Sequence, residues 1–173
     1  MIRSLGAGAL LAAGLAAGCS PTFNWREVRI EPTPLTAMLP CKPDKATREV
    51  PMAGRKVELT AWSCEAGGAT FALLFADIGG PARLGEVLAQ WNTATLANLR
   101  SAGGHASPFR PPGALALPQS VKVIAAGRRP DGSTVESHAA YFAHGTQVYQ
   151  AVIYAGQMRP EATDGFFAGL RFP

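Results

Sequence analysis

Three histidines are the side chains of this sequence best suited to bind a metal or to transfer a proton near neutral pH. They are His105 in a Gly-rich segment, His138 two residues after Glu136, and His144 next to a glycine in an expected turn. No two of them have the i, i+4 spacing that places a pair of zinc ligands on one helix face. We therefore predict no metal site, and we interpret the three histidines as solvated polar residues. A composite site assembled from loops is the alternative.

The serine and cysteine residues lack the local sequence that usually exposes a catalytic nucleophile. The chain contains no Gly-x-Ser-x-Gly elbow, and its Gly-Gly pairs, in EAGGAT and SAGGHAS, are not followed by the Lys-Ser or Lys-Thr of a phosphate-binding loop. A pair of carboxylates brought together from distant segments, as in glycosidases, stays open. We predict no catalytic residue and no cofactor.

Composition and charge narrow the classes of partner. The 173 residues are 47% hydrophobic and 16% charged, which is typical of one globular domain with appendages. Sixteen basic residues against 12 acidic ones give a net charge of +4, and no basic stripe is concentrated in one segment. The sequence therefore indicates no nucleic-acid partner.

The first eighteen residues have the layout of an export signal. A basic residue, Arg3, precedes an apolar run over residues 5–17, and small residues follow up to Cys19. A membrane-spanning helix needs about 20 apolar residues, and this run is shorter and rich in glycine. One interpretation is an ordinary signal peptide cut near Ala17, which would leave Cys19 as a thiol.

Residues 16–19, with the sequence AAGC, resemble the lipobox of bacterial lipoproteins. The resemblance implies cleavage before Cys19 and attachment of diacylglycerol to its sulfur, so that the lipid connects the protein to a membrane. Ala16 stands where the lipobox usually has leucine. Ser20 stands where lipoproteins retained in the inner membrane often have aspartate, so the resemblance implies an outer-membrane protein facing the periplasm.

The number of cysteines fits the same interpretation. Of three cysteines, Cys19 would carry lipid, and Cys41 and Cys64 would remain as a pair able to join in an oxidising compartment. In the chain-entropy model this disulfide would stabilise the fold by about 3.5 kcal/mol. Two free buried thiols are the alternative.

Hydrophobic periodicity predicts an α+β domain with an antiparallel sheet. We expect a signal peptide over residues 1–18, a Pro-rich tether over 19–37 and a single domain over 38–173. One long amphipathic helix begins at Pro81 and separates two groups of strands; its apolar stripe includes Trp91, which we interpret as a core residue. The segment 105–120 is expected to be a loop, and a short helix beginning at Pro160 closes the chain. The expected strands are 48–54, 55–64, 69–78 and three runs within 121–156, and the tether could contain a short edge strand at 24–30.

This element order, with the C-terminal pattern VYQAVIYAG followed by FFAGLRF, resembles the PsbP-like fold, named for an extrinsic protein of photosystem II. The chain is also similar to small lipoproteins of Gram-negative bacteria. The resemblance implies an accessory or binding protein without a shared catalytic motif. We therefore expect a lipid-anchored envelope protein with a periplasm-facing binding domain and an envelope protein as a potential partner. The alternatives are a periplasmic enzyme with a loop-assembled site and a structural subunit of an envelope complex.

Overall fold

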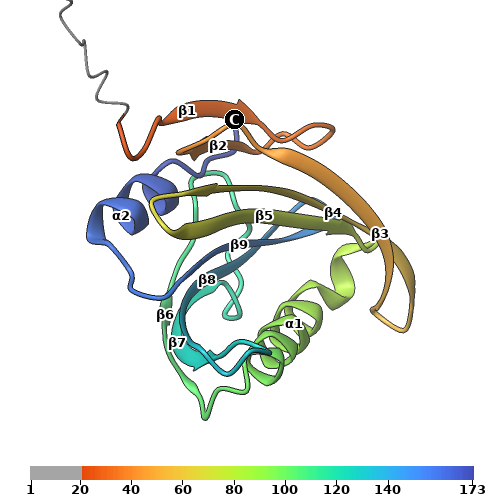
Figure 1. The fold of residues 1–173 in the computed structure, drawn as a ribbon. Helices are drawn as coiled ribbons and strands as arrows, with labels where there is room; N and C mark the ends of the chain where they lie inside the picture. The colour runs from red at the N-terminus through yellow and green to blue at the C-terminus, as the bar shows by residue number, and fades with distance from the viewer. Residues whose placement is uncertain (1–20) are drawn as a thin grey trace, which may run out of the picture.

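A strongly curved antiparallel sheet organises the part of the chain that the computed structural model describes, residues 21–173 (Figure 1). Its seven strands lie in the order β3-β4-β5-β9-β8-β7-β6, and every neighbouring pair is antiparallel. The α+β class predicted from the sequence is confirmed in this broad form. The strands of this sheet are β3 (Asp44–Met52), β4 (Arg55–Ala66), β5 (Ala69–Asp77), β6 (Gly104–Pro108), β7 (Val121–Arg128), β8 (Thr134–His144) and β9 (Gln147–Ala155).

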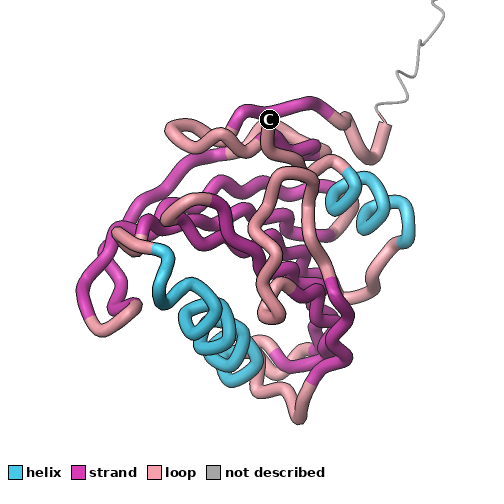
Figure 2. The backbone as a smooth tube through the Cα atoms, turned by 180° about the vertical axis from the view of Figure 1, so that it is seen from behind, coloured by secondary structure: helices cyan, strands magenta, loops and turns pink. Residues whose placement is uncertain are grey.

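Two helices lie on opposite faces of the sheet, as both views of the backbone show (Figures 1 and 2). A 3-10 turn, Pro81–Arg83, leads into α1 (Leu84–Asn98), which lies against the concave face. The shorter α2 (Pro160–Ala168) packs on the other face beside a separate two-stranded sheet of β1 (Arg26–Arg29) and β2 (Thr36–Leu39). The curved sheet therefore separates two hydrophobic cores.

Alternation along the strands supplies both cores, because successive side chains of a strand point to opposite faces. In β8, Tyr141 belongs to the core beneath α1, and its neighbour Phe142 belongs to the core beneath α2. Both side chains are fully buried. The central strands are apolar on both faces for this reason, whereas the edge strands β3 and β6 expose most of their residues.

The segment before residue 38 differs from the extended tether expected from its prolines. Residues 26–39 form the β1–β2 hairpin, in which Ile30, Leu35 and Ala37 are buried in the core beneath α2. The backbone of Thr36 also pairs with that of Arg171 near the C-terminus. Most of the expected tether is thus part of the folded domain.

The segment expected as a loop over residues 105–120 contains a strand at its start. Residues 104–108 form β6, which pairs with β7 at the edge of the sheet. The rest of the segment is irregular and is held by backbone hydrogen bonds, from the Leu115 amide to the Ala143 carbonyl and from the Phe172 amide to the Pro112 carbonyl. The prediction of a loop was therefore wrong for its first residues.

A disulfide joins Cys41, which follows β2, to Cys64 in β4, with 5.9 Å between their Cα atoms. It is the pair expected from the sequence if Cys19 carries lipid. The bond connects the segment leaving the small sheet to the large one, and Cys64 pairs in register with the buried Phe71 of β5. The disulfide therefore links the two sheets covalently.

Candidate binding groove

The three histidines do not come together in the structure. His105 on β6 is exposed, and in the strand register Ile124 of β7 separates it from His138 of β8. His144 lies at the far end of β8, where its ring stacks on Phe172 at 4.3 Å between centroids. Among residues 21–173, no group of three His, Cys, Asp or Glu side chains is arranged to hold a metal ion.

His138 is largely buried, with 12% of its side chain exposed, and it has a carboxylate partner. Its Nε2 lies 3.0 Å from Oε1 of Glu136, whose Oε2 accepts a hydrogen bond of 3.2 Å from the Met158 amide. These contacts attach the segment before α2 to β8. Because Glu136 is engaged on both oxygens, we interpret this pair as a structural connection between two elements.

The lipidation residue expected from the sequence, Cys19, lies outside the described residues. No helix within residues 21–173 is long and apolar enough to cross a membrane. Among the concave features of the described residues is a groove whose lining is mostly apolar.

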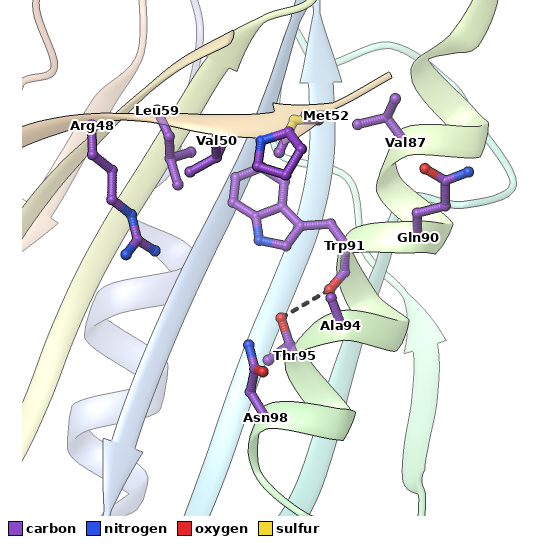
Figure 3. Close-up of a pocket in the computed structure, with 11 residues that line it drawn as sticks. Arg48, Val50, Met52, Leu59, Val87, Gln90, Trp91, Ala94, Thr95 and Asn98 are labelled. Carbon is purple, nitrogen blue, oxygen red and sulfur yellow. Dashed lines mark hydrogen bonds between the residues drawn. The ribbon is translucent and has the colours of Figure 1, made fainter. Parts of the chain in front are cut away.

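The groove lies between β3 and α1 on the concave side of the sheet (Figure 3). It has a volume of about 280 Å³. One wall comes from the edge strand β3, and the other comes from one face of α1. The lining residues are Arg48, Val50, Pro51 and Met52 of β3, Leu59 of β4, and Val87, Gln90, Trp91, Ala94, Thr95 and Asn98 of α1.

The groove exists because α1 covers only part of the concave face. The helix contacts β8 and β9 near the middle of the sheet, so the β3–β4 side of the curve extends past it. Beside the helix, Ala72 and Leu74 of β5 and Tyr154 of β9 are partly buried apolar neighbours of the same core. Burial raises the pKa of Tyr154 to about 12, so its hydroxyl stays neutral at physiological pH.

Contacts at both ends of α1 fix the helix relative to the sheet. At its start, Arg83 donates a 2.6 Å hydrogen bond to the Ala53 carbonyl in the β3–β4 turn and pairs with Glu86 at 2.8 Å. The hydrogen bond from Arg83 lowers the pKa of Glu86 below its ordinary value. At its end, the Leu99 carbonyl accepts from the Arg128 amide, and a side chain at Gly127 would collide with the Leu99 backbone. The groove therefore has two firmly held walls.

A buried polar network lies beneath the helix face of the groove. Gln150 of β9 donates from Nε2 to Oγ1 of Thr95 at 2.9 Å and to the hydroxyl of Tyr141 at 3.1 Å. Thr95 in turn donates to the carbonyl of Trp91, at 3.0 Å. Burial raises the pKa of Tyr141, which favours the neutral hydroxyl. Since buried polar groups are costly when unpaired, this network holds Thr95 and the turn that carries Trp91 in one arrangement.

Trp91 occupies the centre of the groove. Its indole projects from α1 toward Val50 and Leu59 on the opposite wall (Figure 3). The ring also contacts Tyr141 in an edge-to-face arrangement with 6.4 Å between centroids. The residue is half-buried. One side of the indole packs against the core, as expected from the sequence, and the other side lines the groove.

Arg48 was not singled out from the sequence, although it is the charged residue of the groove. In the strand register it lies opposite Leu59, and it shares its face of β3 with Val50 and Met52. The signal in the sequence is an arginine in phase with apolar residues of an alternating strand. That signal is weak, because an edge strand often carries exposed charges.

A scan against protein-family models finds no match, and a search of curated proteins finds no relative of this chain. Function is therefore inferred from the sequence pattern and from the geometry of the groove.

Proposed function

We propose that this protein is a lipid-anchored component of a bacterial cell envelope whose α+β domain binds a small ligand in the groove between β3 and α1. The observation that carries the binding function is the groove itself, with its two held walls and the half-exposed Trp91 at its centre. Small-molecule sites are concave and mostly apolar, with a few polar groups at defined positions, and this groove has that composition.

The proposed location is supported by the export pattern of residues 1–18 and the lipobox-like residues up to Cys19. The Cys41–Cys64 disulfide supports it independently, because disulfides persist in oxidising compartments such as the bacterial periplasm. A diacylglyceryl group has two acyl chains, which is enough for stable anchoring, whereas one chain holds only marginally. Sorting to the outer membrane, with the domain facing the periplasm, is part of the proposal because Ser20 follows the cysteine.

The order of strands and helices supports a finer classification as a PsbP-like domain. The helix α1 lies between two antiparallel groups of strands, and the last strand, β9, leads into the short helix α2. The similarity of this element order to that of PsbP-like domains favours an accessory or binding role. Function is then assigned from the groove, because one fold can serve many functions.

Metabolic labelling with radioactive palmitate tests the anchor. The unmodified chain is expected to incorporate the label and to fractionate with the outer membrane, and Cys19→Ser is expected to lose the label completely. Ser20→Ala is the matched control next to the modified residue and should keep it. Label that persists in Cys19→Ser would show that this cysteine does not carry the lipid.

A further inference from the structure

The groove carries charge of one sign. Of its lining residues, Arg48 alone has an ionised side chain, and the other polar groups are the neutral Gln90, Thr95 and Asn98. Within residues 21–173, Arg48 takes part in none of the ion pairs of the structure. Arg48 is exposed, and its side chain extends from β3 at one side of the groove (Figure 3). The groove thus offers a planar cation whose hydrogen-bonding groups are available.

Most of the remaining lining is apolar, apart from the neutral Gln90, Thr95 and Asn98. Val50, Met52 and Leu59 form the strand side, and Trp91 with Val87 forms the helix side. A volume of about 280 Å³ lies just below the range of about 300–1,000 Å³ for small-molecule sites. A ligand that fits is therefore small, with an apolar body and one polar end.

We propose that the groove binds a small amphipathic anion, with its apolar chain against Trp91 and Met52 and its carboxylate or phosphate on Arg48. The inference rests on the proposed binding function and specifies its ligand class. Guanidinium groups bind carboxylates and phosphates through two parallel hydrogen bonds, which fixes the orientation of the anionic end. No acidic side chain lines the groove to repel that end. A cationic amphipath would meet Arg48 as a like charge.

Photo-crosslinking of the full chain in phospholipid nanodiscs tests this ligand class. The probe is decanoic acid carrying a diazirine in its chain, and the competitors are decanoate, decanol and decyltrimethylammonium. We expect the probe to label peptides of β3 and α1. Decanoate should compete about fivefold better than decanol, and its advantage over decyltrimethylammonium should be larger. Partition of the probe into the bilayer is the same for every variant, so comparisons between variants report on the protein.

Three variants separate the contribution of charge from that of the groove. Arg48→Gln is expected to remove the advantage of decanoate over decanol, and Arg48→Lys should keep part of it because the positive charge remains. Ala94→Phe fills the groove from an exposed position of α1 and should lower labelling at least about fivefold. Ala89→Phe makes the same change at an exposed helix position outside the groove and should label normally.

The possible results distinguish failure of the ligand class from failure of the binding function. An uncharged occupant, such as apolar side chains of a partner protein, would make decanol as good a competitor as decanoate. That result, with Ala94→Phe still reducing labelling, would overturn the anionic ligand and keep the groove as a binding site. Equal labelling of Ala94→Phe and Ala89→Phe would overturn the binding function of the groove, and the anionic ligand with it.

Discussion

Removal of the disulfide by the double substitution Cys41→Ala and Cys64→Ala is expected to lower the free energy of unfolding by about 3.5 kcal/mol. The bonded cysteines are 23 residues apart in sequence, and opening this loop increases the conformational entropy of the unfolded chain. The substitution also frees the segment after β2 from β4. Urea denaturation of the domain, residues 21–173, measures the effect as a lower transition midpoint.

Dithiothreitol provides the matched control for this experiment. Reduction should lower the stability of the unmodified domain to nearly that of the double variant, and it should leave the double variant unchanged. A stability loss below about 1 kcal/mol, or an equal response of both proteins to reduction, would contradict the assigned contribution of the disulfide.

The substitution Phe166→Ala is expected to lower the free energy of unfolding by about 3 to 5 kcal/mol. Phe166 of α2 is fully buried, and its ring meets those of Phe71 and Phe167 edge to face, at 5.5 and 5.2 Å between centroids. Alanine would leave a cavity where α2 meets the sheet and would remove both aromatic contacts. Thermal unfolding followed by circular dichroism provides an independent reading of the loss.

Leu115→Ala is the control for the Phe166 substitution, because Leu115 is 36% exposed. It should change stability by no more than about 0.5 kcal/mol, since surface substitutions away from special features have small effects. If Phe166→Ala cost as little as Leu115→Ala, α2 would contribute little to the core in which the structure places it.

The elements with strong periodicity could be predicted from the sequence, and those stabilised by tertiary contacts could not. The apolar runs that became β5, β8 and β9, and the stripe of Leu84, Val87 and Leu88 in α1, show their periods directly. β6 has almost no apolar residues because it is an exposed edge strand, so its sequence resembles a loop. In the β1–β2 hairpin, β1 lies within the short edge strand allowed at 24–30, whereas β2 follows Pro32 and Pro34 and was not expected, although Leu35 anchors the hairpin in the core.

The groove could not be predicted from the sequence, because its lining residues come from distant segments. Arg48 and Trp91 are far apart in sequence, and they line one groove only because the curvature of the sheet brings β3 over α1. Neither strand register nor sheet curvature can be read from alternation alone. The disulfide was easier, because three cysteines with one assigned to lipid leave a single pairing.

The mass of the intact protein extracted from the membrane tests the central claim, that this chain is an anchored envelope protein, most directly. We expect a chain that begins at Cys19 and carries the added mass of a diacylglyceryl group, located on the N-terminal peptide by fragmentation. An unmodified chain that begins near Gly18, or one that retains residues 1–18, would contradict the lipid anchor.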